Sequence, residues 1–461
     1  MHRRLFPTLG LAAAIALALT VAGSSAPAAP SADPSPTDAG EPPGRGVSPA
    51  AAAAEAAKAA DAAVVAVPAP TPLALRYYRT GNRWWVVAVL WGFAVPAVLL
   101  FTGAAARLRS LANRLAGGGA GWRWVPALAI FFALYSLVIF IADLPLAFYL
   151  GWVRQHAYGL SNQTLGKWTA DAAKALLVGL LGGAAVVWMP YLLLRRSPRR
   201  WWLWCGLAAA PFLCFVMLVS PIWIEPLFNR FGPMRDKGLE ARILALAERA
   251  GVPAERVFEV EKSVDTKRVN AYVTGFAGTH RIVLWDTLVD RLEDREVLVV
   301  MGHEIGHYAL GHVALGIALT SALVLAGLWA VHRTAGGVLR RFGGRFGFGS
   351  LADPASLPLL ALLLNLFGLL AQPAALAWSR HEEREADRFA LELTRDNVAC
   401  GGAFVKLQTE NLSNPRPGPI YVMMRASHPP IAARVAMCNE YRPWAEGRPL
   451  RYGDRMADAA P

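Results

Sequence analysis

Six long apolar runs constrain this 461-residue chain more than any other feature of its sequence. Each is close to the roughly 20 residues that a helix needs to cross the hydrocarbon core of a bilayer. Tryptophans cluster at the ends of several runs, where membrane proteins place interfacial aromatic side chains. We therefore predict a mainly α-helical, polytopic membrane bundle. The runs cover approximately residues 84–103, 123–150, 172–194, 201–226, 312–332 and 356–378.

The charge distribution agrees with a membrane location. Only 17% of the residues are charged, whereas soluble domains carry about a quarter. The formal net charge is +13, but the arginines lie at the ends of the apolar runs and form no basic patch interleaved with exposed aromatics. This pattern favours the lipid bilayer as a partner and excludes nucleic acid. The placement of arginines between the apolar runs also argues against the alternative that the runs are buried helices of a large soluble protein.

The remaining sequence divides into a leader, two domains and a tail. Residues 1–24 combine a basic start with an apolar stretch, which fits either a secretory signal peptide or a first membrane anchor. Residues 25–75 are rich in alanine and proline and predict a disordered tether. Four runs fall in an N-terminal membrane domain, 76–226, and two fall in a second domain, 227–445. We expect residues 446–461 to be a disordered tail.

A polar stretch between the fourth and fifth runs predicts a small mixed domain. The segment "KGLEARILALAERAGV" has apolar residues at helical spacing and ends near Gly251, which suits a helix C-cap. The segments "RVFEVEKS" and "HRIVLWDTLV" are typical of short strands and flank "RVNAYVTGFAG". A second polar region begins at Ser379. Functional groups from the two polar regions would have to meet across the last two runs.

The motif "MGHEIGHYALGH" points to metal chemistry. On a helix, His303 and His307 lie on one face because they are four residues apart, so both can reach one tetrahedral zinc ion. A bound zinc ion lowers the pKa of water, and Glu304 is placed to accept the proton. The surrounding sequence lacks proline and is rich in helix formers. We therefore predict one zinc ion per chain, with Glu304 as the general base of a metallopeptidase.

A third protein ligand is needed to leave one coordination position open. His312 arrives one residue too early for the HExxHxxGxxH pattern of the metzincins. The segment "SRHEEREADRFALEL" offers Glu382, Glu383 and Glu385, and spacing alone does not choose among them. Asp387 lies one helical turn after Glu383 and could support a ligand from behind.

Several blocks of the chain together resemble the type I CAAX prenyl proteases, which are membrane zinc endopeptidases of the gluzincin kind. The resemblance covers roughly residues 80 to 440, and its family pattern SRxxExxAD implies Glu383 as the third ligand. It also implies a helical cage around a chamber. It further implies that Asn270 binds the substrate backbone and that His428 and Arg434 border the cleft. The blocks are "VRQHAYGLSNQT", "WIEPLFNRF", "VNAYVTGF", "RIVLWDTL", "GHEIGHYALGH", "SRHEEREAD" and "NLSNPRPGPIYVMMRASHPPIAAR".

The predicted function is a zinc-dependent membrane endopeptidase that acts on peptides or proteins, including membrane-associated ones. A transporter or channel is the main alternative, but Asp143 and Glu225 are the main acids within or at the ends of the runs, and inverted repeats are not evident. An inactive scaffold is a third class, although it has no physical need for the intact motif residues. The secretory-like start departs from the family pattern, so the peptidase chemistry is predicted and the prenyl specificity is not.

Arginines between the runs predict the orientation in the cell membrane. They lie in the connections 104–123, 195–200 and 333–355, which are every second connection and so reach one side. The positive-inside tendency makes that side the cytoplasm, so the active site faces outward. An outward domain would permit Cys400 and Cys438 to pair. The arginines of these connections are Arg107, Arg109, Arg114, Arg123, Arg195, Arg196, Arg199, Arg200, Arg333, Arg340, Arg341 and Arg345, while Arg76, Arg79 and Arg83 fall on the outer side.

Overall fold

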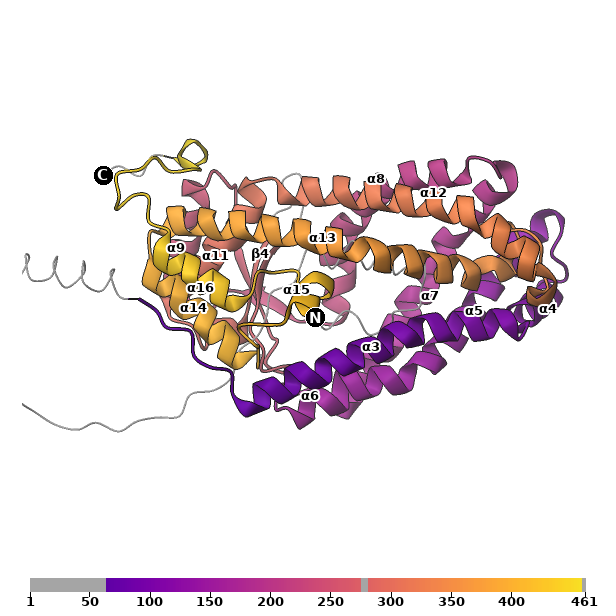
Figure 1. Cartoon of the computed structure of the whole chain (residues 1–461), viewed down its shortest axis with the longest axis horizontal. Helices are drawn as coiled ribbons and strands as arrows, with labels where there is room; N and C mark the ends of the chain where they lie inside the picture. The colour runs from indigo at the N-terminus through magenta and orange to yellow at the C-terminus, as the bar shows by residue number, and fades with distance from the viewer. Residues whose placement is uncertain (1–63, 275–280, 458–461) are drawn as a thin grey trace, which may run out of the picture.

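The computed structural model describes residues 64–274 and 281–457 of the chain. The expected signal peptide or anchor at 1–24 lies outside the described residues, as does most of the expected tether. Figure 1 shows an elongated molecule in which long helices run along the longest axis. A small sheet and several shorter helices gather at one end of these long helices. The sheet and these shorter helices therefore distinguish one end of the bundle from the other.

Six helices are long and apolar enough to cross a membrane, which confirms the prediction of a polytopic helical bundle. Each coincides with one of the six apolar runs of the sequence. Most extend beyond the run, because polar residues at the run ends continue the same helix. The six are α3 (Pro72–Phe101), α5 (Trp124–Phe148), α7 (Leu165–Arg196), α8 (Trp201–Val219), α12 (His312–Phe346) and α13 (Leu357–Thr394).

Shorter elements connect the long helices and build the opposite end. The shorter α-helices are α4 (Ala104–Leu115), α6 (Arg154–Ala157), α9 (Lys237–Arg249), α10 (Asp286–Val289), α11 (Asp294–Ala309), α14 (Asn397–Glu410), α15 (Pro419–Met424) and α16 (Ile431–Glu440). Single turns of 3-10 or π geometry lie at Gly121–Arg123, Tyr149–Val153, Ser220–Ile224, Glu225–Leu227, Pro354–Ser356 and Gly453–Arg455.

The small sheet has four strands in the order β1-β2-β4-β3. Strands β2 (Val257–Val260) and β4 (Arg281–Trp285) pair in parallel, whereas β1 (Phe231–Pro233) and β3 (Ala271–Thr274) pair antiparallel with them at the two edges. The strands expected around "RVFEVEKS" and "HRIVLWDTLV" are therefore present. Because β3 is an edge strand, only one of its sides is occupied by a described strand.

The core is divided into two clusters of buried apolar residues. One cluster lies among the long helices and includes Phe131, Tyr135 and Val331. The other lies at the sheet end, where α9, α11, α13, α14 and α16 pack together. Cys400 and Cys438 belong to this second cluster and form a disulfide between α14 and α16. The last part of α13 enters the second cluster, so one continuous helix joins the membrane bundle to the sheet end.

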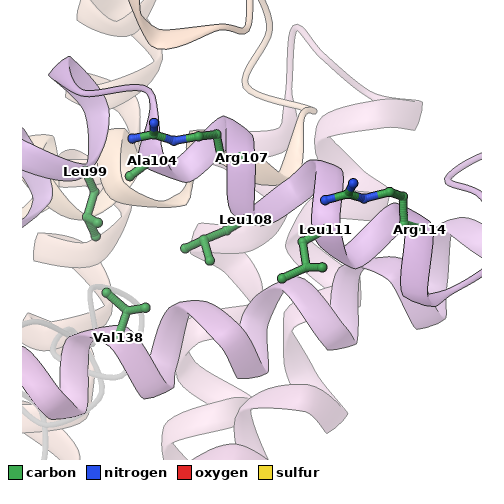
Figure 2. A pocket seen from close by; sticks show the side chains of 7 residues that line it. All are labelled: Leu99, Ala104, Arg107, Leu108, Leu111, Arg114 and Val138. Atoms are coloured by element: carbon green, nitrogen blue, oxygen red, sulfur yellow. The ribbon is translucent and has the colours of Figure 1, made fainter.

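The connections that carry most arginines meet at the end of the bundle opposite the sheet (Figure 1). Arg109 donates to Gly347 O and Arg345 donates to Phe101 O, so α4 contacts the α12–α13 connection and α12 contacts the end of α3. Helix α12 continues to Phe346, which corrects the expected connection 333–355: Arg333, Arg340, Arg341 and Arg345 all lie on the helix. In the expected connection 104–123, Arg107, Arg109 and Arg114 lie on α4. A cavity of about 350 Å³ opens between α3, α4 and α5 at this end, with two arginines at its rim (Figure 2).

Part of the expected disordered tether is ordered. Val65 exchanges two 3.0 Å hydrogen bonds with the side chain of Asn439, and Gln408 Nε2 donates to Pro68 O at 2.9 Å. Helix α3 then begins at Pro72, where Thr71 caps its first turn. Residues 64–71 are therefore a strap on the sheet end. Val65 packs where a side chain at position 401 would lie, and Gly401 leaves this space open.

The expected disordered tail also folds in part. Residues 446–457 return to α13, where the backbone amides of Arg451 and Tyr452 donate to the carboxylate of Glu392 at 2.8 Å. The Tyr452 side chain is buried against Phe389. Composition suggested disorder because the segment is polar and rich in turn formers. Its order comes from the buried Tyr452 side chain and from two acids of α13, Glu385 and Glu392, that accept hydrogen bonds from this segment.

Candidate metal centre

The HExxH motif lies on α11, which begins with two reciprocal caps. The Glu293 side chain accepts from the backbone of Glu296, and the Glu296 carboxylate accepts from Glu293 N at 2.8 Å. These bonds satisfy amides that a helix otherwise leaves unpaired at its start. The helix places His303 and His307 on its face toward α13. Their Nε2 atoms are 3.1 Å apart.

Gly306 allows α13 to approach the motif closely. A Cβ atom at this position would lie 3.0 Å from Cδ1 of Phe389, which is tighter than ordinary contacts between side chains. The glycine between the two histidines therefore lets the helices pack against each other. This packing brings Glu383 of α13 to the two imidazoles, although it is 76 residues beyond His307 in sequence.

Glu383 is the acid that meets the two histidines. Its carboxylate oxygens lie 3.3 Å from His303 Nε2 and 3.6 Å from His307 Nε2. Two imidazole nitrogens and one carboxylate oxygen, all within 4.8 Å of one another, form the one metal-ligand group found in the described part of the chain. This donor set fits zinc, which is commonly bound by histidine and carboxylate ligands with one position left open.

The other two acids of the segment point elsewhere. Glu385 forms hydrogen bonds with the hydroxyl of Tyr452 and with Arg388, and so holds the C-terminal segment. Glu382 is buried, but it takes no part in the group of converging ligand atoms. The helical spacing explains the difference, because residues one or two positions apart face different directions.

Asp387 supports His303 from behind. Its Oδ1 atom lies 2.8 Å from His303 Nδ1, and Arg434 Nε donates to Oδ2 at 2.8 Å. The Asp387 side chain is fully buried, and Arg434 stacks over Phe404, with 4.0 Å from Cζ to the ring centroid. Arg434 thus lies behind the ligand group, where it neutralises Asp387 and holds its orientation. The resemblance to the family had implied a place for Arg434 beside the cleft.

Of the two further predicted residues, His428 contacts the ligand group and Asn270 lies at the start of strand β3. His428 Nε2 is 3.1 Å from Glu383 Oε2, and its Nδ1 lies 2.9 Å from the hydroxyl of Ser427. Asn270 directly precedes strand β3, and its backbone oxygen accepts from Trp285 N at 2.9 Å. The side-chain oxygen of Asn270 is buried and has no hydrogen-bond partner among the described residues. A buried acceptor of this kind is available to a ligand.

Two carboxylates contact the His303 ring, one at each nitrogen. Burial by itself would lower the pKa of His303, but its hydrogen bonds to Asp387 and Glu383 raise that pKa to about 10. Both acids are ionised partners that stabilise positive charge on the ring. The two carboxylates that hold a proton on His303 would also attract a divalent cation, and binding of the cation would displace that proton.

The other titratable groups of the site are shifted mainly by burial. Burial lowers the pKa of His307 to about 3 and the pKa of His428 to about 4, so both rings are neutral at pH 7. Burial raises the pKa of Glu304 to about 7, and the backbone amide of Val273 donates a hydrogen bond to its carboxylate. A carboxylate with a pKa near the working pH is suited to accept and then return a proton.

One contact of the site was missed by the sequence interpretation. The sequence offers His312 only as a possible metal ligand, whereas in the structure its Nδ1 atom lies 2.9 Å from Nδ1 of His307. Gly311, which precedes His312, is the sequence feature that could have predicted this contact. A glycine permits a break in the helix, and the break lets the His312 side chain point back toward the motif.

Family models match almost the whole described chain. Residues 233–442 match the peptidase family M48, and residues 73–230 match the N-terminal region of CAAX prenyl proteases, described as five membrane helices. An uncharacterized metalloprotease of Bacillus subtilis, YhfN, is 33% identical over 80% of this chain and 85% of its own length. CAAX prenyl protease 1 of Saccharomyces cerevisiae is 30% identical over 66% of this chain and 70% of its own length.

A solved structure shows the same architecture. The crystal structure of S. mikatae Ste24p superposes with a TM-score of 0.69 at 25% identity and covers 79% of this chain and 87% of that one. The helical bundle and the converging histidines and glutamate define a membrane-embedded metalloprotease. The chain belongs to peptidase family M48 and is a homologue of CAAX prenyl protease 1. The resemblance seen in the sequence is confirmed, and so is the prediction of a metalloprotease.

Proposed function

We propose that this protein is a zinc-dependent endopeptidase whose metal is held by His303, His307 and Glu383. The observation that carries the proposal is the convergence of one ligand atom from each of these three side chains within 4.8 Å. The carboxylate of Glu304 interacts electrostatically with His303 and Glu383. Bound zinc would act as a Lewis acid on the scissile carbonyl and lower the pKa of the attacking water. The substrates are peptides or proteins that reach the membrane surface, since the site adjoins the membrane-spanning helices α12 and α13.

The proton transfers belong to Glu304. Its carboxylate accepts a proton from the attacking water and delivers it to the departing amine. The hydrogen bond from Val273 N ties this base to strand β3. The base and the edge of the sheet are therefore held in fixed relation, which keeps the carboxylate aligned with a bound peptide.

Strand β3 supports an extended substrate. It is an edge strand of the sheet, and a peptide can align with such an edge through main-chain hydrogen bonds. Asn270 stands at its start with an unpaired side-chain oxygen among the described residues, which can accept from a substrate amide. His428 is neutral and can donate to the substrate oxygen on which negative charge develops.

Removal of the metal tests the proposed function. The purified full-length protein in detergent or nanodiscs is expected to contain about one zinc ion per chain and to cleave an internal bond of an unstructured peptide. Treatment with a zinc chelator should abolish cleavage, and added zinc should restore it because the ligand group is preformed. Mass spectrometry of the products and elemental analysis are the measurements. A chelated, metal-free protein that cleaves at the original rate would contradict the proposal.

Two substitutions test the proposed contacts with the substrate. Asn270→Ala and His428→Ala are each expected to lower kcat by roughly tenfold to a thousandfold, because each removes a polar group that acts on the substrate. Zinc content should stay near the wild-type value. His381→Ala, at an exposed position of α13, is the matched control and should retain full activity. Wild-type kinetics in both variants would leave Asn270 and His428 with structural roles only.

We also propose that the metal-binding end faces the extracytoplasmic side of the cell membrane. Helix α4 and the end of α12 carry arginines and lie at the opposite end of the bundle, and arginine favours the cytoplasmic side. The disulfide between Cys400 and Cys438 joins two helices of the metal-binding end, and disulfides persist mainly in oxidising compartments. Both sulfur-bearing residues are buried, which fits a structural cross-link between α14 and α16.

Reporter fusions distinguish the two orientations. Alkaline phosphatase fused to the C-terminus should be active, and a fluorescent protein at the same place should remain dark, because the end of the chain would follow the metal-binding domain outward. The matched fusions after residue 198, between α7 and α8, should give the reverse pattern. A fluorescent C-terminal fusion with inactive phosphatase would place the metal-binding end in the cytoplasm.

A further inference from the structure

The two histidines of the motif differ in what holds their second ring nitrogen. Nε2 of each ring faces Glu383. On the far side of the rings, His303 Nδ1 lies 2.8 Å from the Asp387 carboxylate, whereas His307 Nδ1 lies 2.9 Å from His312 Nδ1. Both nitrogens of both rings are therefore engaged, but one ring is supported by a carboxylate and the other by a third imidazole.

A helix break at Gly311 makes the second contact possible. In a continuous helix, side chains five residues apart point about 140° away from each other. Helix α11 ends at Ala309, and Gly311 adopts a left-handed conformation with φ of 72° before α12 begins at His312. This turn brings the His312 ring back against His307, where it is 9% exposed. The first residue of a membrane-spanning helix is thus packed against the metal-binding motif.

Hydrogen-bond chemistry fixes the protons of this pair. One hydrogen lies between the two Nδ1 atoms, and it must belong to one of them. A ligand imidazole binds metal through an unprotonated nitrogen, so His307 carries its hydrogen on Nδ1 when Nε2 is the ligand atom. His307 is then the donor, His312 Nδ1 is the acceptor, and the hydrogen of His312 lies on its Nε2.

We infer that His312 is a positioning residue that fixes the tautomer and the ring orientation of His307. The inference rests on the proposed zinc site. His312 does this as a neutral acceptor, so it adds no charge to the site. On the other ring, the charge of Asp387 is balanced by Arg434, which donates to both carboxylate oxygens. The partners that orient the two ligand rings therefore add no net charge. Glu383 is the one charged ligand of the proposed zinc site.

Two substitutions separate the acceptor from the bulk of the side chain. His312→Phe keeps a planar ring but removes the acceptor, and it should weaken zinc binding by about 10–100-fold, as loss of a residue behind a ligand typically does. His312→Asn places an amide oxygen where Nδ1 stood, and its zinc dissociation constant should stay within about threefold of the wild type. Competition with a chelator measures both constants. The absorption spectrum of the cobalt-substituted protein should change in the phenylalanine variant and be restored in the asparagine variant.

The controls separate positioning from ligation and from general damage to the fold. His332→Phe makes the same change on the same helix, about 30 Å away by helical rise, and should match the wild type. A phenylalanine variant with the wild-type dissociation constant and cobalt spectrum would overturn the inference alone. If the phenylalanine variant holds no metal even at saturating zinc, His312 is a ligand and the inference that it positions His307 is also overturned. A wild-type protein that binds no metal would overturn the proposed function along with it.

Discussion

Replacing Glu304 with glutamine is expected to reduce peptide hydrolysis by about three to four orders of magnitude, which is the upper range of what a general base contributes. The amide has nearly the same shape as the carboxylate but cannot accept a proton from the attacking water. The variant should still contain about one zinc ion per chain, because the proposed ligands are His303, His307 and Glu383. Hydrolysis of a fluorogenic peptide and elemental analysis of the same sample are the two measurements.

The comparison with Glu296→Gln strengthens this test. Glu296 lies on the same helix two turns earlier and is buried, but its carboxylate caps the helix and pairs with Lys406 at 2.6 Å. That substitution should affect the melting temperature more than catalysis by the folded protein. Full activity in Glu304→Gln would show that another group moves the proton. Loss of both zinc and activity would instead mean that Glu304 helps to hold the metal.

Glu383→Ala is expected to lose both zinc and activity. Two imidazoles remain in that variant, and the missing ligand is one of three that converge. The loss of zinc affinity should exceed the roughly 10–100-fold that follows removal of a residue behind a ligand. Zinc content after dialysis against a weak chelator is the measurement, made alongside a thermal melt to confirm that the variant is folded.

The neighbouring acid provides the matched control for this variant. Glu382 is buried on the same helix but does not converge with the histidines, so Glu382→Ala should keep its zinc. Retention of zinc by Glu383→Ala together with loss by Glu382→Ala or Glu385→Ala would reverse the assignment of the third ligand. Each of the three variants removes one carboxylate from a different face of α13. Comparing them therefore tests which face of the helix packs against the histidines.

Much of the architecture could be predicted because it depends on local patterns. An apolar run of sufficient length can satisfy its backbone in a bilayer only by forming a helix or a closed barrel, so the six spans follow from hydropathy alone. The connection expected at 333–355 is shorter, because α12 continues to Phe346. The other errors fell on the two segments that composition assigned to disorder, residues 64–75 and 446–457. Each is held by a few specific contacts, such as Val65 with Asn439 and Tyr452 with Phe389. Average composition does not reveal contacts of this kind.

The HExxH motif alone predicts the pair His303 and His307 and the proposed base Glu304, because a spacing of four residues fixes which side chains share one face of a helix. Spacing alone leaves the third acid open, the resemblance to the family implies Glu383, and the packing of α13 against α11 brings that acid to the two histidines. Glu382, Glu383 and Glu385 have the same side chain. Which of them reaches the histidines depends on how α13 is rotated about its axis where it packs against α11 at Gly306. The same packing places Asp387 and Arg434 behind His303, and the break at Gly311 places His312 behind His307. A helix encodes the directions of its own side chains, but the partner that each side chain meets depends on contacts between residues far apart in the chain.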